Sequence, residues 1–129
     1  ERYPVKAKKA AVPERRGAAF VAMRRDGAVF LRRRPGSGML AGMSEPPSTN
    51  WSARADGALG EGAAPFAADW RRVGEIAHVF THFRLTLEVW CAMVDDDPAI
   101  DGWWSKPQDI AAEALPTLMR KVLKAAEIG

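Results

Sequence analysis

The segment Phe80-Thr81-His82-Phe83 places an aromatic ring, a hydroxyl group and an imidazole next to one another. A ring can stack on a nucleobase, and a hydroxyl group can both donate and accept a hydrogen bond. Placed at the end of a strand, such a segment could read the edge of a base. The alternative is a strand corner in which Phe80 and Phe83 pack internally and His82 is structural.

A glycine-rich stretch over residues 34–51 (RPGSGMLAGMSEPPSTNW) is the second place where chemistry could occur, because glycines let backbone N–H groups approach a phosphate. No Gly-Lys-Ser/Thr follows, and Pro46-Pro47 stands where a phosphate-binding helix would begin, so the stretch is not a P-loop. Cys91 is the single cysteine, which excludes an internal disulfide, a Cys-rich zinc site and a four-cysteine iron–sulfur cluster. Three adjacent carboxylates at 95–97 lack the spacing of a calcium loop and predict a solvated turn.

Strand patterns surround the Phe80-Thr81-His82-Phe83 segment. Apolar residues alternate with polar or aromatic ones over 84–94, which predicts a strand with one buried face, and a second strand is expected over 74–83. Upstream, GAAFVAM and AVFLRRR flank an Asp26-Gly27 turn signal and predict a β-hairpin. The alternating apolar residues are Leu85, Leu87, Val89, Cys91 and Met93.

Helix signals gather toward the C-terminal end. Ser105 and Gln108 form a capping-box pattern and Pro107 falls in the first turn, which predicts a short helix over 106–114. A second helix is expected from Pro116, with an apolar stripe at helical spacing that predicts core packing. The stripe consists of Leu118, Met119, Val122, Leu123 and Ala126.

A chain of 129 residues is the size of one domain. Residues 1–16 have no apolar periodicity and contain two prolines, so we expect an extended connector from a longer protein, followed by one domain over 17–129. Over 35–65 we expect a long ordered loop, with a short helix within 64–71. Strands followed by helices predict an α/β (α+β) fold, with a small mixed sheet flanked by helices.

Positive charge is concentrated near the N-terminus. Residues 1–34 carry 11 basic and 3 acidic side chains, although the whole chain has a net charge of only +3. Such an arm can lie along phosphates, and the alternative is a solubilising linker. No apolar stretch reaches the length of a membrane helix, so we expect a cytoplasmic domain. The candidate phosphate contacts are Lys6, Lys8, Lys9, Arg15 and Arg16.

Three sequence runs together resemble the C-terminal domain of MutY-type adenine DNA glycosylases. They are GMLAGMSEPPSTNW, VGEIAHVFTHFRLTLEVW and ALPTLMRKVLKAA, preceded by the basic YPVKAKK and the strand RRGAAFVAM. The resemblance covers nearly the whole chain, and the F-[ST]-H-F element is its most specific part. The family's domain has a Nudix-like fold in which the hydrolase motif is degenerate. The absence of any Arg-Glu or Glu-Glu dipeptide here agrees with that degeneracy.

This resemblance implies that the domain recognises 8-oxoguanine opposite adenine in duplex DNA and takes part in base excision repair. Phe80, Thr81 and His82 then take the family's lesion-contacting positions, where serine is commoner than Thr81. Before Glu45 the family has a larger residue than Ser44.

For the whole protein, the resemblance implies an N-terminal catalytic domain with a [4Fe–4S] cluster. For this fragment we expect no catalytic residue, metal, cofactor or activity. We expect it to act as a monomer, with duplex DNA and the catalytic domain as partners, at the bacterial nucleoid. Two alternatives from other classes stay open. One is a Nudix-type nucleotide pyrophosphohydrolase with an atypical metal site at Glu45, Asp56 and Glu61, and the other is a protein-interaction module that uses surface aromatics.

Overall fold

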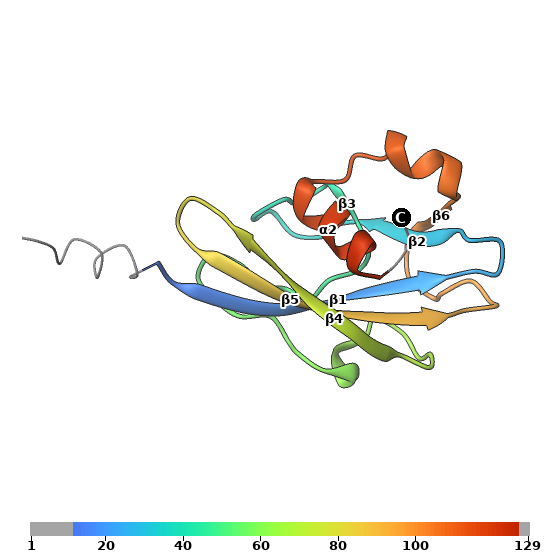
Figure 1. The fold of residues 1–129 in the computed structure, drawn as a ribbon, viewed down its shortest axis with the longest axis horizontal. Helices are drawn as coiled ribbons and strands as arrows, with labels where there is room; N and C mark the ends of the chain where they lie inside the picture. The colour runs from blue at the N-terminus through green and yellow to red at the C-terminus, as the bar shows by residue number, and fades with distance from the viewer. Residues whose placement is uncertain (1–11, 127–129) are drawn as a thin grey trace, which may run out of the picture.

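The computed structural model describes residues 12–126, which form a six-stranded mixed sheet (Figure 1). The strand order is β3-β2-β1-β5-β4, and β6 pairs with β2. β1 and β5 run parallel, and the other paired strands are antiparallel. The α+β fold with a small mixed sheet, expected from the sequence, is confirmed. The elements are β1 (Glu14–Met23), β2 (Val29–Arg33), β3 (Ser44–Glu45), the 3-10 helix η1 (Glu61–Ala63), β4 (Arg71–Val79), β5 (Arg84–Met93), β6 (Trp103–Ser105), the 3-10 helix η2 (Pro107–Ala112) and the α-helix α2 (Thr117–Ala125).

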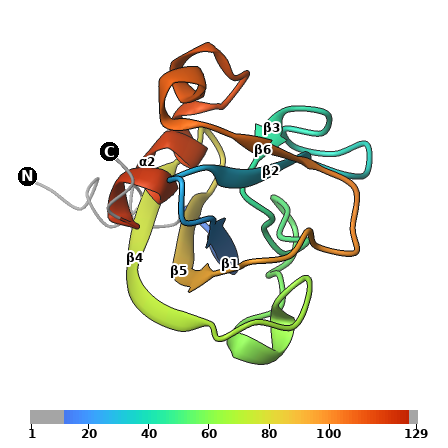
Figure 2. The ribbon, with the colours of Figure 1, turned by 90° about the vertical axis from the view of Figure 1, so that its right-hand side faces the viewer.

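From residue 17 to residue 22, β1 is buried on both faces, which explains the uninterrupted apolar run GAAFVAM. Ala19 and Val21 belong to the core cluster that also contains the apolar residues of α2. Phe20 belongs to a second cluster on the other face, where its ring contacts Trp70 at a centroid distance of 5.2 Å. Figures 1 and 2 show α2 on one side of the β1–β5 pair and the η1 segment on the other.

The alternation predicted for β5 is confirmed along most of the strand. Its apolar positions from Leu85 to Cys91 are buried, and burial raises the pKa of the Cys91 thiol to about 11. Met93, at the strand's end, is instead 57% exposed. On the opposite face Glu88 is buried. Its carboxylate accepts hydrogen bonds from Gly60 N (2.9 Å) and Trp90 Nε1 (3.1 Å), which offset the cost of burying it.

The helix predicted from Pro116 onward is confirmed. α2 begins one residue after Pro116, and the expected stripe from Leu118 to Ala126 is buried against the sheet. The expected hairpin also forms, around a turn in which Gly27 has φ 88°. Its strands pair at Met23 and Val29, and β2 also pairs with β6 over Val29–Leu31 and with β3 at Arg32 and Arg33.

The two short helices agree only in part with the sequence-based predictions. The helix expected within 64–71 is wrong, since the 3-10 turn lies earlier, at η1. Phe66 and Trp70 pack on each other and on the second core cluster, which holds that segment in an irregular path. The helix expected over 106–114 is present as the 3-10 helix η2, with Pro107 in its first turn, but the predicted capping box is wrong. Ser105 ends β6, and Lys106 caps η2 without a side-chain hydrogen bond.

The N-terminal boundary also differs, because β1 begins at Glu14, inside the expected connector over 1–16. The backbone there pairs with β5 and donates from Arg16 N to Asp56 Oδ1 (2.9 Å). No helix among residues 12–126 has the length and hydropathy needed to cross a membrane.

Replacing Ser105 with alanine should raise the unfolding free energy by about 1 kcal/mol. The Ser105 hydroxyl is buried and has no hydrogen-bond partner among the described residues, so the folded state gains nothing from it. Urea unfolding measures the change. Ser48→Ala is the matched control and should be destabilising, because the Ser48 hydroxyl donates to Glu45 at 2.6 Å. A loss of stability in Ser105→Ala would contradict this account.

Candidate nucleic-acid interface

Thr81 and His82 form a two-residue turn that joins β4 to β5. The last paired residues are Val79 and Arg84, and Phe80 N donates to Phe83 O at 2.8 Å. Both turn residues are exposed. Their side chains make no hydrogen bond or ion pair with any other residue in the described range 12–126. The hydroxyl and the imidazole are therefore available to a ligand at the end of the hairpin.

The two phenylalanines that flank the turn support it from beneath. Phe83 is buried, and Phe80 is half-buried and stacks on Phe83 with a centroid distance of 4.6 Å. Phe80 also stacks on Trp51 (6.1 Å) and meets the edge of His78 (4.8 Å). Both rings therefore pack internally, as the alternative interpretation of the sequence proposed for Phe80 and Phe83. Of the three predicted lesion contacts, Thr81 and His82 are exposed. The third, Phe80, is half-buried and packs against other aromatic side chains.

The start of β1 lies at the same end of the sheet as the turn (Figure 1). Because β1 and β5 are parallel, Glu14 pairs with Arg84 and Arg16 pairs with Thr86. Arg16 and Arg84 are exposed, whereas half-buried Arg15 donates from Nε to Ala53 O at 3.1 Å. Arg84 was not among the phosphate contacts predicted from the sequence, although its place directly after Phe83 is a signal. The other predicted phosphate contacts, Lys6, Lys8 and Lys9, lie outside the described residues.

His78 contacts helix α2 through Lys121. Lys121 Nζ lies 3.1 Å from His78 Nδ1 and donates to Ala77 O at 3.2 Å. Since an ammonium group can only donate, His78 Nδ1 must accept, which requires a neutral ring with its proton on Nε2. Burial and the charge of Lys121 both lower the pKa of His78, in agreement with that state. His78 therefore ties the hairpin to the helix.

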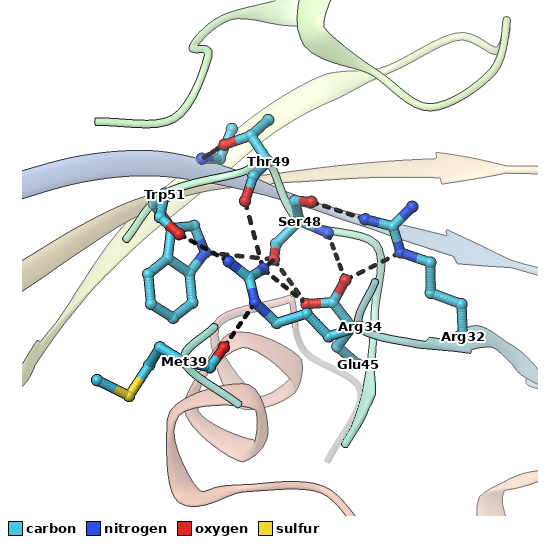
Figure 3. A network of polar contacts seen from close by, with 8 residues as sticks. Arg32, Arg34, Met39, Glu45, Ser48, Thr49 and Trp51 are labelled. Atoms are coloured by element: carbon cyan, nitrogen blue, oxygen red, sulfur yellow. Dashed lines mark hydrogen bonds and ion pairs between the residues drawn. The ribbon is translucent and has the colours of Figure 1, made fainter. Parts of the chain in front are cut away.

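A buried ion-pair network that was not predicted from the sequence joins β2 and β3 to the loop that follows β3 (Figure 3). Glu45 is 1% exposed, and its carboxylate meets Arg32 Nε at 2.9 Å and Arg34 Nη1 at 3.3 Å. Burial lowers the pKa of Arg34, while the charge of Glu45 acts in the opposite direction. The Arg34 guanidinium also donates to Met39 O (3.1 Å), Ser48 Oγ (2.7 Å), Thr49 O (3.3 Å) and Trp51 O (2.8 Å).

The acidic residues considered for a metal site have different partners. Glu45 is bound to two arginines, Asp56 accepts from Arg16 N, and Glu61 lies exposed in η1. Within residues 12–126, no group of three or more His, Cys, Asp or Glu side chains is arranged to hold a metal ion. The described part of the chain therefore does not bring Glu45, Asp56 and Glu61 together for metal-assisted hydrolysis.

The amino-acid sequence of this chain is similar to part of two adenine DNA glycosylases. The chain is 28% identical to human adenine DNA glycosylase over 109 residues and 30% identical to the mouse enzyme over 111 residues. These alignments cover 74% and 77% of this chain but only 20% and 22% of the two relatives. The chain thus spans about a fifth of the length of the curated relatives that it matches.

Solved structures show the same fold. The C-terminal domain of mouse MUTYH, solved in complex with human PCNA, superposes with a TM-score of 0.62 and 24% identity, covering 87% of this chain and 86% of that one. A MutT protein from Methanosarcina mazei superposes with a TM-score of 0.65 and 19% identity, covering 91% and 95%. The family model described as NUDIX domain matches residues 18–125. With that match over most of its length, the chain belongs to the NUDIX domain family.

Proposed function

We propose that this domain recognises 8-oxoguanine opposite adenine in duplex DNA, as the C-terminal domain of an adenine DNA glycosylase in base excision repair. One observation carries the proposal. An exposed hydroxyl and an exposed imidazole stand on a supported two-residue turn, at the sheet end that also presents Arg16 and Arg84. The similarity to adenine DNA glycosylases supports it.

The chemistry of the lesion suits the Thr81 hydroxyl. Oxidation converts guanine N7 from a hydrogen-bond acceptor into an N–H donor and places a carbonyl acceptor at C8. A hydroxyl group offers two lone pairs and one proton, so Thr81 can accept from N7–H and donate to the C8 carbonyl. Unmodified guanine has no proton at N7. Thr81 therefore distinguishes the two bases, and His82 contacts the base edge or a neighbouring phosphate.

Basic residues around the turn fix the domain on the duplex. Arg16 and Arg84 are exposed and not engaged through their guanidinium groups within the described chain, so they can meet phosphates directly. Phosphate contacts supply affinity without sequence information, whereas the turn supplies lesion specificity. Lys6, Lys8, Lys9 and Arg15 are the further phosphate contacts in this proposal.

The proposal assigns excision to another part of the protein. Removal of adenine, and the [4Fe–4S] cluster, belong to an N-terminal catalytic domain with which this domain cooperates on one duplex. The domain acts as a monomer at the bacterial nucleoid, in the cytoplasm. By itself, the chain should release no adenine.

Fluorescence anisotropy with two labelled duplexes tests the proposal. The duplexes are identical except for one base opposite adenine, which is 8-oxoguanine in one and guanine in the other. The chain should bind the lesion duplex at least about fivefold more tightly, since one well-placed pair of hydrogen bonds to a base contributes about 1–3 kcal/mol. Non-specific binding should show a Kd of about 10⁻⁴ to 10⁻⁶ M. Equal affinities for the two duplexes would contradict the proposal.

Deleting residues 1–11 should weaken binding to both duplexes and flatten the dependence of log K on log salt. The deleted segment contains Lys6, Lys8 and Lys9 but leaves β1 intact, because β1 begins at Glu14. Each lost phosphate contact should reduce the slope by about 0.9. The same titrations at several salt concentrations give the measurement. An unchanged slope would show that the arm is only a linker, without affecting the test of lesion specificity.

A further inference from the structure

We propose that Trp51 is a positioning residue for the Thr81–His82 turn, and that the buried Arg34–Glu45 pair holds Trp51 in place. The inference rests on the proposed function, because it assigns the support that gives the turn its specificity. Trp51 does not reach the lesion, since it is 1% exposed. It acts through Phe80.

Planar groups form a continuous column from the ion pair to the turn. The guanidinium carbon of Arg34 lies 4.0 Å from the ring centroid of Trp51. Trp51 stacks on Phe80 with an interplanar angle of 29°, and Phe80 stacks on Phe83 with an angle of 20°. Phe80 and Phe83 also close the turn through their backbone hydrogen bond. A shift of the Trp51 ring is therefore transmitted to the backbone on either side of Thr81.

Trp51 itself is fixed at several points. Its carbonyl oxygen accepts from Arg34 Nη2 at 2.8 Å, and its indole Nε1 donates to Ser48 Oγ at 3.3 Å (Figure 3). Ser48 is held in turn by Glu45, which accepts from its hydroxyl and from its backbone N–H. Trp51 is thus held through its backbone carbonyl, through its indole N–H and through both ring contacts. The turn above it therefore rests on a fixed surface.

The segment that carries Trp51 also holds the basic end of β1. We call residues 48–57 the support segment. Thr49 N donates to Ala18 O at 2.9 Å, and Gly57 N donates to Arg16 O at 2.8 Å. A side chain at Gly57 would overlap with Thr49, so this close approach requires glycine. The support segment thus holds the turn, which contacts the base in the proposed function, at a fixed position relative to Arg16, which contacts a phosphate.

The turn has few other contacts that could position it. Thr81 and His82 are exposed, and within the described chain their side chains are not hydrogen-bonded to any residue. Their place is set by the strands below and by the ring of Phe80. Discrimination between two bases that differ only at N7 and C8 requires the hydroxyl to be placed within about 0.5 Å. Loss of the Trp51 ring should therefore reduce discrimination more than it reduces general DNA binding.

Trp51→Leu tests the inference, with Trp70→Leu as the matched control. Trp70 is also buried, but it packs in the second core cluster on the opposite face. Two readouts are compared in chains shown to be folded by circular dichroism at low temperature. The first is the NMR amide signals of Thr81 and His82 in the free chain. The second is the ratio of affinities for the 8-oxoguanine and guanine duplexes.

In Trp51→Leu we expect the Thr81 and His82 signals to shift or broaden, and the affinity ratio to fall to within about twofold of one. Trp51→Phe, which keeps a stacking ring, should retain most of the ratio, and Trp70→Leu should retain both readouts. If Trp51→Leu does not fold, Phe80→Leu replaces it, because it breaks the column at a half-buried position. The same expectations apply to that variant.

Unchanged turn signals and an unchanged ratio in a folded column variant would overturn the inference. An equal loss of ratio in Trp70→Leu would also overturn it, because the effect would then follow from general destabilisation. The proposed function fails separately, if the unsubstituted chain shows no preference for the lesion duplex. In that case the NMR signals of the turn still decide whether Trp51 positions it.

Discussion

Glu45→Ala should lower the unfolding free energy by about 3–5 kcal/mol, the largest effect expected for a single substitution in this chain. Glu45 is 1% exposed and is the carboxylate partner of both Arg32 and Arg34. The Arg34 side chain is only 8% exposed. Without Glu45 it is therefore a buried cation that has lost its counter-charge. Urea unfolding followed by circular dichroism measures the loss.

Glu75→Ala is the matched control for this substitution. Glu75 also pairs with an arginine, Arg72, at 2.9 Å, but both side chains are about half exposed at 51% and 44%. Pairs of this kind contribute about 0–1 kcal/mol. If Glu45→Ala cost no more than Glu75→Ala, the buried network would not be the anchor that we describe.

Replacing both charged partners should not restore stability in this protein. A buried ion pair can often be exchanged for apolar residues at little cost. Here, however, Arg34 also donates to the carbonyl oxygens of Met39 and Trp51, which would lose their donors. The double variant Arg34→Met/Glu45→Met should therefore have a much lower unfolding free energy than the unsubstituted chain in the same urea measurement.

Thr81→Val should cost about 1–3 kcal/mol in discrimination between 8-oxoguanine and guanine. Valine nearly preserves the shape of threonine but can neither accept from N7–H nor donate to the C8 carbonyl. Thr81 is exposed in a turn, and within residues 12–126 its side chain is without a hydrogen-bond partner, so the variant should fold normally. The two-duplex anisotropy titration measures the ratio.

Two further variants separate the hydroxyl from its surroundings. Thr81→Ser keeps the hydroxyl and should change the ratio little. His82→Ala should weaken binding to both duplexes by similar factors, because a phosphate or shared-edge contact does not distinguish the bases. If Thr81→Val leaves the ratio within about twofold of the unsubstituted chain, the side chain is not the reader. A backbone carbonyl of the turn, which valine keeps, would then accept the N7 proton.

Local patterns in the sequence determined the elements that carry the turn. The alternation from Leu85 to Cys91 placed one face of β5 in the core, because the period of a strand matches that spacing. The stripe of α2 did the same at helical spacing. The strand predicted over 74–83 ends earlier, at Val79, so that Phe80-Thr81-His82-Phe83 forms the connection to β5. The sequence therefore placed this segment at the end of a strand, whereas the exposed turn was decided by the pairing of β4 with β5.

The same local patterns failed where an element depends on a distant partner. β6 has three residues, Trp103–Ser105, and exists because it pairs with β2, so its Ser105 only resembled a helix cap. β1 reaches back to Glu14 because β5 is there to pair with it. Parallel pairing of strands so far apart along the chain leaves no signal at short range.

Tertiary structure alone decided how the candidate site is supported. In the sequence, Arg34, Glu45 and Trp51 lie in a glycine- and proline-rich loop without periodicity, far from Phe80. Folding brings Trp51 against Phe80 and buries the ion pair beside it. Residue types and short-range spacing can therefore identify the groups that face a ligand. The contacts that hold them in place join residues distant in sequence, and their energies depend on burial that only the folded chain provides.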